Sequence, residues 1–510
     1  MTTTTQLISG GRVLDLAGDV DQPPVADVLI ENGRIAAVGA AAAERSVREA
    51  GIKRIDATGK LVIPGLVNAH YHSHDVLLRG CYEQIPMDIW GFYSFPANYS
   101  RRSKEDIRLR TVLGAVECLS NGITTLQDMV TIVGPDREHV DAVREAYEAC
   151  GARVVLGLQI SDRAAVDAVP FWRDMPDDVV SQLPGAADPS KLQALIEDLV
   201  EEGGTERLNW ALAPSAPQRC SDELLAWVAG LSERRQLQVF THLYEARSQA
   251  VLARLAYPEG SLLAHLDRFD LIGPRLTIAH GVWIAPDEID RFGAAGASLV
   301  CNPMSNMKLL NGFAPVVHYG RAGATMGLGC DNCSCSDAQN LFQSMKMFAL
   351  MWGFQTAAGE GDAAREAFRA ATLGGAKAIG LEGEVGAIRP GYRADIVLLD
   401  LDMPSYRPLN SAIRQIVYGE TGTGVHTVIV GGDIVVEDRR HVAFANEQLK
   451  AEAEAALGRL KDEIAGVNER NERMLPQLLD AYEKANRYPL PLDRFSVRGG
   501  EPSSGKGSRS

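Results

Sequence analysis

Two histidines separated by a single residue, His70 and His72, are the first residues along the chain whose types and spacing could bind a metal ion. They end an apolar run that begins at Val62 and contains a Pro-Gly break, which predicts a buried strand leading into the pair. Because alternate residues of a strand point to the same side, the two imidazoles can converge on one ion. An HxH pair alone is a weak signal, so the prediction depends on further ligands elsewhere in the sequence.

Three other residues of metal-binding types follow the same pattern: His242, His280 and Asp331 each close a short apolar run. A carboxylate buried after such a run is costly unless it binds something, which favours a ligand role for Asp331. The chain has only ten histidines, so the position of four of them at predicted strand ends is hard to attribute to chance. Glu245 follows His242 by three residues, where its carboxylate could reach a water on the metal; the alternative is a capping or surface glutamate.

Eight apolar runs alternate with longer amphipathic stretches between residues 61 and 380, the pattern of repeated βα units. The predicted strands are Val62–His70, Ile123–Gln127, Arg153–Gln159, Asn209–Ala213, Gln238–His242, Leu276–His280, Ser298–Asn302 and Ala324–Gly329. Each ends in polar or small residues, as expected where barrel strands open into functional loops. The sequence therefore predicts an α/β protein built on a (β/α)8 TIM barrel, with the candidate ligands at its C-terminal mouth.

The segments on either side of the barrel have strand-like composition and predict a small composite β-sandwich domain formed from N- and C-terminal segments. The first half covers residues 1–60 and the second covers 381–445. Residues 446–497 carry an apolar repeat at helical spacing and predict a helical extension. The last segment, 498–510, is rich in Gly, Ser and charge, which is typical of a disordered tail.

Composition excludes several classes of partner. With 51 Lys and Arg against 66 Asp and Glu, the formal charge is −15, which argues against nucleic acid or an anionic membrane as the main partner. No secretory signal and no apolar run near 20 residues is visible, so we expect a cytoplasmic protein. The eight cysteines form no disulfide framework. A zinc site on Cys330, Cys333 and Cys335 is an alternative, but it lacks a second CxxC pair.

Taken in order, these motifs resemble the amidohydrolase superfamily, and within it the branch of cytosine deaminase-like, chlorohydrolase-like and adenosine-derivative deaminase-like enzymes. The resemblance extends from the N-terminal strands to about residue 440. The matching segments are Pro64–His72, Leu77–Gly80, Asn121–Thr125, His242-x-x-Glu245, Ala279–Gly281, Asn302–Leu309, Gly329–Asp331, Ala394–Leu398 and Val428–Gly432.

The resemblance implies one divalent metal ion, Zn²⁺ or Fe²⁺, and assigns its ligands by position. The implied ligands are His70, His72, His242 and Asp331. An open coordination position would hold a water whose pKa the cation lowers. Glu245 would move a proton from that water to the leaving nitrogen, and His280 would hydrogen-bond the attacking hydroxide or the oxyanion. Asp331 would assist the same proton transfer.

A second metal ion is not expected. Relatives with two ions bridge them with a carboxylated lysine on the fourth strand. Here no lysine lies between Lys104 and Lys191, and Lys191 stands in a polar stretch rather than at a strand end.

The chain departs from adenosine-derivative deaminases around the expected pocket. It has Ser215 in a position where they often carry histidine, Cys301 before the Asn-Pro pair, and Asn332 rather than glycine after the metal aspartate. Asp75 and Asn332 could hydrogen-bond an amino-substituted ring. Six aromatic residues between 82 and 99, Trp90 among them, predict a wall for a flat substrate, with loop packing or a subunit contact as the alternative.

The leading hypothesis is a hydrolase that cuts a non-peptide C–N bond of a small molecule, deaminating an amino-substituted heterocycle or amidine. On the same site, hydrolysis of an amide, urea or carbamate, or displacement of a halide or amine from an aromatic ring, is an alternative. A non-catalytic scaffold is the alternative from another class, although every ligand position is filled. Relatives often form homo-oligomers, and we expect one here.

Overall fold

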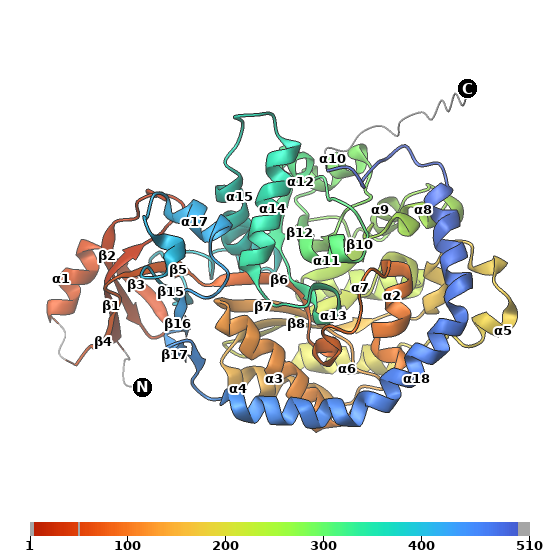
Figure 1. Cartoon of the computed structure of the whole chain (residues 1–510), viewed down its shortest axis with the longest axis horizontal. Coiled ribbons are helices and arrows are strands. Elements are labelled where there is room, and N and C mark those ends of the chain that lie inside the picture. The colour runs from red at the N-terminus through yellow and green to blue at the C-terminus, as the bar shows by residue number, and fades with distance from the viewer. Residues whose placement is uncertain (1–4, 49–50, 498–510) are drawn as a thin grey trace.

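Two nine-stranded sheets form the framework of the chain in the computed structural model, which describes residues 5–48 and 51–497 (Figure 1). One sheet is the barrel. The other contains strands from both ends of the chain and lies beside the barrel. The prediction for residues 498–510 concerns a segment outside the described residues.

The barrel strands pair in parallel in chain order from β6 to β13, and the short β14 then pairs with β6, so the first and last strands meet. The strands are β6 (Leu66–His72), β7 (Ile123–Val130), β8 (Arg153–Ile160), β9 (Leu208–Pro214), β10 (Val239–Leu243), β11 (Leu276–His280), β12 (Ser298–Cys301), β13 (Thr325–Leu328) and β14 (Asp331–Asn332). This topology confirms the predicted fold class.

Gly329 shows why the last strand can reach the first. A Cβ atom at this position would lie 2.2 Å from Asn302 Oδ1 and 2.8 Å from His70 Cβ. Only glycine allows the backbone to pass this close to His70. The turn from β13 into β14 therefore delivers Asp331 directly beside the first strand.

Helices follow the barrel strands and cover the barrel from outside. The principal helices are α3 (Lys104–Ser120), α4 (Arg137–Cys150), α6 (Ser190–Glu202), α7 (Asp222–Arg235), α8 (Arg247–Ala256), α10 (Pro286–Ala294), α12 (Val316–Arg321) and α14 (Leu341–Gln355). Shorter helices occupy the connections, among them α2 (Met87–Ser94), α5 (Asp177–Val180), α9 (Leu262–Asp267), α11 (Pro303–Lys308), α13 (Cys333–Ser336), α15 (Ala363–Arg369) and α16 (Gly375–Ala378).

The second sheet has the order β18-β17-β16-β15-β5-β1-β2-β3, with β4 paired to β1. Its strands are β1 (Thr5–Val13), β2 (Val25–Glu31), β3 (Arg34–Val38), β4 (Lys53–Asp56), β5 (Lys60–Pro64), β15 (Ile396–Asp400), β16 (Val425–Val430), β17 (Asp433–Glu437) and β18 (Arg440–His441). Two helices accompany these strands, α1 (Ala40–Arg48) and α17 (Ala412–Tyr418). The antiparallel pairing of β5 with β15 joins the N-terminal strands to the C-terminal ones.

The predicted strand Val62–His70 is divided between the two sheets. Its first residues belong to β5 and the remainder to β6, with the break at Gly65. The N–H of Gly65 donates to the carbonyl of Asp395, 2.8 Å away, and a Cβ here would clash with Thr124. The chain therefore passes from one sheet into the other within a single residue, which apolar composition alone could not reveal.

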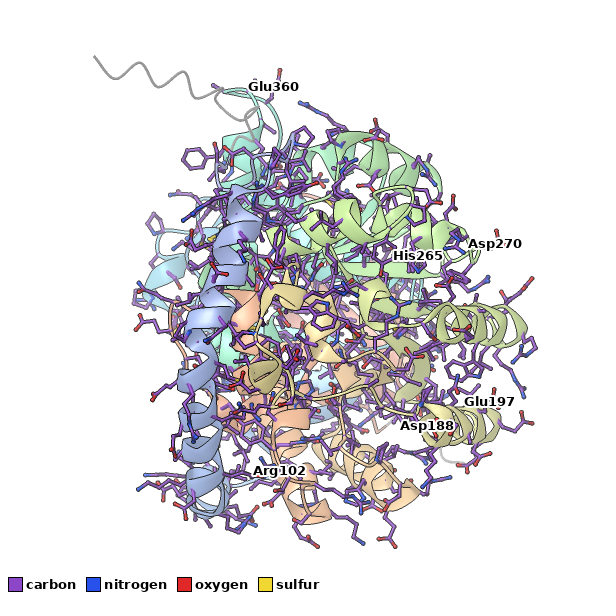
Figure 2. All side chains as sticks on the ribbon, turned by 90° about the vertical axis from the view of Figure 1, so that its right-hand side faces the viewer. Arg102, Asp188, Glu197, His265, Asp270 and Glu360 are labelled. Atoms are coloured by element: carbon purple, nitrogen blue, oxygen red, sulfur yellow. The ribbon has the colours of Figure 1, made fainter. Side chains whose placement is uncertain are left out.

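The last helix, α18, spans Asn446–Arg487 and runs along the barrel before turning past its mouth (Figure 1). Arg102, labelled in Figure 2, pairs with Glu463 of α18. Buried residues recur along one face of the helix, among them Leu460, Val467, Met474 and Leu478. No helix among the described residues is long and apolar enough to cross a membrane.

A buried ion pair joins the barrel to the second sheet. Arg153, at the start of β8, donates two hydrogen bonds to Asp395: its Nε–H to Oδ2 at 2.8 Å and an Nη–H to Oδ1 at 3.1 Å. Both side chains are only 1% exposed. Asp395 also accepts from the N–H of Gly431 at 2.7 Å, and Arg153 donates to the carbonyl of Glu206 at 2.8 Å. Such a pair is fully hydrogen-bonded, and loss of one member leaves a buried charge without compensation.

We therefore predict that Asp395→Asn lowers the free energy of unfolding by about 3–5 kcal/mol, since it strands the guanidinium of Arg153. Equilibrium denaturation in urea measures the change. Asp402→Asn is the matched control, because its partner Arg407 is 62% exposed and surface pairs contribute about 0–1 kcal/mol. Equal stability of the two variants would contradict the assignment.

Candidate metal centre and active site

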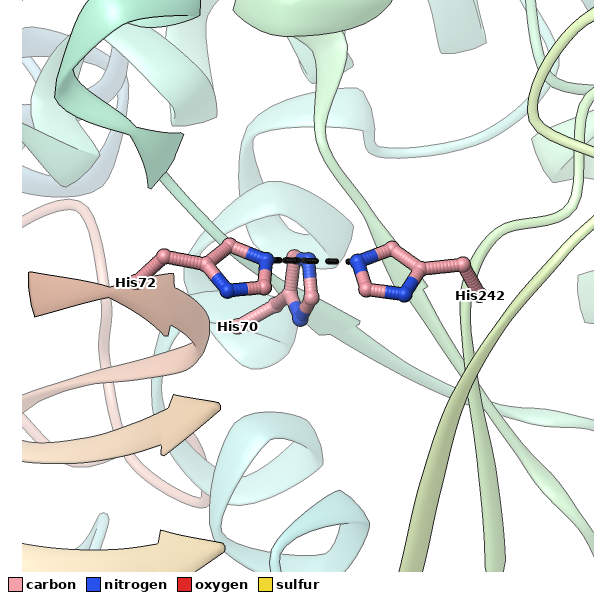
Figure 3. Close-up of side chains that lie close together, drawn as sticks. All are labelled: His70, His72 and His242. Carbon is pink, nitrogen blue, oxygen red and sulfur yellow. Dashed lines mark hydrogen bonds between the residues drawn. The ribbon is translucent and has the colours of Figure 1, made fainter. Parts of the chain in front are cut away.

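Three imidazoles from two distant segments of the chain meet at the mouth of the barrel (Figure 3). The Nε2 atom of His72 lies 3.2 Å from Nε2 of His70 and 3.2 Å from Nε2 of His242. His70 and His72 are at the end of β6, and His242 is near the end of β10. All three nitrogens lie within 4.8 Å of one another.

The other ring nitrogens determine the tautomers. His72 Nδ1 lies 2.7 Å from the carbonyl oxygen of Met129, and His242 Nδ1 lies 2.6 Å from that of Ser215. A carbonyl can only accept, so each Nδ1 carries the proton and each Nε2 presents a lone pair. Two lone pairs 3.2 Å apart repel one another unless a cation lies near both. The arrangement fits a metal ion held by Nε2 atoms, with backbone carbonyls orienting the rings.

Asp331 brings a carboxylate to the same place. The pairing of β14 with β6 sets Asp331 opposite Tyr71, between the two histidines of the first strand. Its Oδ1 lies 3.4 Å from His70 Nε2 and 3.6 Å from His72 Nε2. Burial alone would raise its pKa, but the hydrogen bond and charge of His70 and the neighbouring imidazoles hold the pKa of Asp331 well below its usual value.

Protonation states suit metal binding. Burial lowers the pKa of His70 to about 4 and the pKa values of His72 and His242 to about 3. The three rings are therefore neutral at pH 7, and Asp331 is ionised. Three neutral imidazoles and one carboxylate are a donor set typical of Zn²⁺ and Fe²⁺. Cys330, Cys333 and Cys335 form no comparable group within the described ranges.

His280 faces this cluster with an unused nitrogen. Its Nδ1 lies 2.8 Å from Asn306 Oδ1, which accepts the ring proton. Its Nε2 has no hydrogen-bond partner among the described residues and lies 3.7 Å from Glu245 Oε2 and 3.8 Å from Asp331 Oδ2. A buried acceptor of this kind is costly without a donor, so the geometry favours a donor that the chain itself does not supply.

Glu245 is buried next to the cluster and held in place. Its Oε1 accepts from Asn311 Nδ2 at 3.1 Å, and its backbone N–H donates to Gln249 Oε1 at 2.9 Å. Burial raises the pKa of Glu245 to about 7. A carboxyl group with this pKa exchanges protons readily near neutral pH, as a general acid or base requires.

Backbone strain is concentrated at the same strand ends. Tyr244, His280 and Asp331 have φ values of 51°, 75° and 63°, in the left-handed region that residues other than glycine rarely adopt. Each costs of the order of 1–3 kcal/mol. The strain turns the chain at the end of the strands and aims the side chains of His280 and Asp331 into the barrel mouth.

A cavity opens on these residues. Trp90 and Asn332, both expected from the sequence to contact substrate, line it, as do Glu245, His280 and Asp331. Phe92, Phe95 and Met87 add apolar surface. The structure thus brings most of the sequence-predicted site residues around one cavity.

Asp75 lies elsewhere. It is not among the residues that line the cavity, and its carboxylate accepts from the backbone N–H groups of Cys333 and Ser334, each at 3.0 Å. Trp90 Nε1 donates to Ser334 Oγ at 3.1 Å. Asp75 therefore holds the start of α13, and with it the loop against which Trp90 rests.

Several cavity residues were not found from the sequence. His74 lies two residues beyond His72, and its Nδ1 accepts from the N–H of Thr131 at 3.3 Å. The HxHxH spacing of the three histidines could have indicated it. Gln218 and Arg219 come from the loop after β9 and also line the cavity, but no spacing marks them as functional.

The C-terminal helix positions one wall of the cavity. Asn471 on α18 is fully buried and donates Nδ2 to the carbonyl of Phe92 at 2.6 Å, and Arg470 donates to the same carbonyl at 3.0 Å. Phe92 lies in the last turn of α2, where carbonyls lack partners within the helix. Side chains of α18 supply those partners, so this distant segment fixes the helix that carries Trp90.

Comparisons with known proteins agree with this geometry. The sequence model of the Amidohydrolase family matches residues 61–435. The chain is 32% identical over 412 residues to a 5-methylthioadenosine/S-adenosylhomocysteine deaminase of Thermococcus kodakarensis, covering 81% of this chain and 89% of that protein. It is 30% identical over 456 residues to a 5′-deoxyadenosine deaminase of Methanothermobacter thermautotrophicus, covering 89% and 98%.

Among solved structures, an adenosine deaminase from Xanthomonas campestris with bound zinc superposes with a TM-score of 0.78 at 27% identity, covering 90% of this chain and 99% of that one. This chain belongs to the amidohydrolase family. It is a hydrolase that acts on carbon–nitrogen bonds other than peptide bonds.

We predict that the purified protein retains one divalent cation per chain and that His242→Ala weakens its affinity by more than about 100-fold, since removal of residues that merely orient ligands already costs about 10- to 100-fold. Elemental analysis after dialysis measures the retained metal. His426→Ala is the control, because His426 lies on β16 outside the cluster, where it pairs with Asp438. Wild-type metal content in His242→Ala would contradict the assignment.

We predict that Asn471→Ala raises KM about fivefold with a smaller change in kcat, because one buried hydrogen bond to the wall helix is worth about 1 kcal/mol. Steady-state kinetics separates the two constants. Asn446→Ala, an exposed asparagine on the same helix, is the control. A fall in kcat alone would show that α18 acts on the chemistry and not on the wall.

Proposed function

We propose that this protein is a metal-dependent aminohydrolase that replaces an amino group on a planar heterocycle by oxygen and releases ammonia. One observation supports the proposal above all others: Nε2 lone pairs of His72 and His242 face one another beside Nε2 of His70. The buried acids Glu245 and Asp331 line the same cavity. A cation bound there would supply a nucleophilic water, and the carboxylates of Glu245 and Asp331 could exchange its protons.

Four side chains would hold the ion: His70, His72, His242 and Asp331. The donor set and the bound zinc of the Xanthomonas relative favour one Zn²⁺. When bound, such a cation lowers the pKa of a water ligand toward about 7 and supplies a nucleophile at neutral pH. The fourth strand, β9, contains no lysine that could bridge a second ion.

Glu245 would carry the proton. Its carboxylate takes one proton from the attacking water, and the oxygen forms a bond to the ring carbon that bears the amino group. Glu245 then gives the proton to the departing nitrogen, the C–N bond breaks, and ammonia leaves. The hydrogen bond from Asn311 holds the carboxylate in place, and its pKa of about 7 suits both directions of transfer.

His280 would orient the nucleophile. Because its Nδ1 proton is committed to Asn306, its Nε2 can accept a hydrogen bond from the attacking hydroxyl. Asp331 lies 3.8 Å from the same Nε2 and completes the polar side of the site. Proton acceptors thus line one side of the place where the substrate carbon must sit.

The other side of the cavity suits a flat ring. Trp90 and Phe92 on α2 and Phe95 just after it supply aromatic surface, and Asn332 and Ser215 supply polar groups at the cavity wall. The relatives named above support adenosine derivatives as the first substrates to examine. The homo-oligomer and the cytoplasmic location stay predictions.

We predict that Glu245→Gln lowers the rate of ammonia release by about 10²–10⁴-fold, the usual contribution of general acid–base catalysis, while the metal content is unchanged. Amino-substituted purines and pyrimidines are the substrates, and product mass is recorded with ammonia. Glu382→Gln, at an exposed glutamate beside Lys377, is the control.

Wild-type activity in Glu245→Gln would contradict the proposed proton transfer. Release of a carboxylate or CO2 from ureas or carbamates, without ammonia from any aminated ring, would instead assign the site to the other class of C–N bond.

A further inference from the structure

Arg219 is a partly buried cation that lines the cavity and forms no ion pair with the described residues. It lies in the short 3-10 helix Pro217–Arg219 after β9, and its Nε is buried with no hydrogen-bond partner among the described residues. Burial lowers the pKa of Arg219, and no carboxylate of the described chain offsets that effect. Its guanidinium lies over the ring of Phe95, 4.8 Å from the centroid, which fixes its plane but leaves its donors free.

Arg110 and Arg153, the buried arginines among the described residues, both use their terminal nitrogens in hydrogen bonds, although Nε of Arg110, like that of Arg219, has no partner. Arg153 forms the bidentate pair with Asp395, and Arg110 donates to the carbonyls of His74 and Thr131. Asp162, whose backbone N–H donates to the carbonyl of Arg219, accepts from Ser221. Asp88, which lines the same cavity, accepts from the hydroxyl of Ser248. Among the described residues the guanidinium of Arg219 has neither an ion pair nor a side-chain hydrogen bond, and pairing stabilises a charge that is partly removed from water.

The preceding residue has the same property. Gln218 is 3% exposed, its Oε1 has no partner in the described part of the chain, and it lines the same cavity. Two consecutive side chains thus bring unused polar groups to one wall. This wall is polar, whereas Trp90 and Phe92 of α2 give the same cavity an aromatic surface.

Arg219 also stands at the junction of two cavities. It lines the cavity that contains Glu245 and His280, and it lines a second cavity whose walls include neither of those residues. The two share wall residues, among them His74, Phe92 and Gln159, and Arg163 lines only the outer one. A ligand with its ring at the acids could extend past Arg219 into the outer cavity.

We propose that the substrate carries an anionic oxygen group, a carboxylate or a phosphate, that binds the guanidinium of Arg219. This inference rests on the proposed function and adds the substrate class to it. A planar guanidinium offers two parallel N–H donors that match the two oxygens of such a group. Gln218 would bind the same group or the atoms next to it through its free amide.

The test measures binding rather than turnover, in the metal-loaded protein with Glu245→Gln to prevent reaction. Titration calorimetry compares adenosine-5′-carboxylic acid with its primary amide, and cytosine-5-carboxylic acid with its amide. Adenosine 5′-monophosphate distinguishes phosphate from carboxylate. We expect at least one anion to bind about 10- to 100-fold more tightly than its neutral partner, the effect of a charged hydrogen bond worth about 1.5–3 kcal/mol.

Arg219→Gln should abolish that preference and leave binding of the neutral partner unchanged within about threefold, whereas Arg219→Lys should retain part of it because the charge remains. Arg407→Gln, which removes an exposed positive charge, is the control and should keep the full preference. Thermal unfolding of each variant verifies that it is folded.

Equal binding of acid and amide in every pair, or an equal loss of both in Arg219→Gln, would overturn the proposal. Failure of the proposed function has a different result: the anion preference would persist, but the protein with Glu245 intact would release no ammonia from any ligand that binds.

Discussion

The repulsion between lone pairs at the mouth of the barrel is the constraint on which the site depends. Backbone carbonyls of Met129 and Ser215 fix the Nδ1 protons of His72 and His242, so both Nε2 atoms must meet as acceptors. Burial keeps these rings neutral, which removes the option of relieving the contact by protonation. The fold has therefore built a place that a cation stabilises, and the ionised Asp331 adds the negative charge that such a cation needs.

The barrel strands offset the backbone strain of this arrangement. His280 and Asp331 adopt left-handed backbone conformations that the surrounding strands must hold in place. Parallel pairing from β6 to β13 supplies rigid neighbours, and closure by β14 sets Asp331 against the first strand. The buried pair of Arg153 and Asp395 then fixes the other end of the barrel to the second sheet. Rigidity at both ends keeps the ligands close together.

The sequence predicted the fold class, the family and the cluster, because each depends on local patterns. Apolar runs predicted β11 residue for residue, and the position of His280 at its end followed directly. The sequence did not predict that the first apolar run divides at Gly65, because the division depends on the carbonyl of Asp395, which is 330 residues away. Asp75 was expected at the substrate, yet it binds the backbone of Cys333 and Ser334. Contacts with backbone groups leave no mark in residue spacing.

The sequence could not predict substrate specificity, for a related physical reason. The groups that handle the reaction sit at strand ends, where position in the fold can be read from hydrophobic pattern. The groups that we propose to select a substrate, Gln218 and Arg219, come from a loop, and what distinguishes them is a buried polar atom without a partner among the described residues. The wall helix is held by Asn471, from a segment beyond the family match. Chemistry and selectivity thus reside in different parts of the chain, so the pocket can change while the four ligands stay fixed.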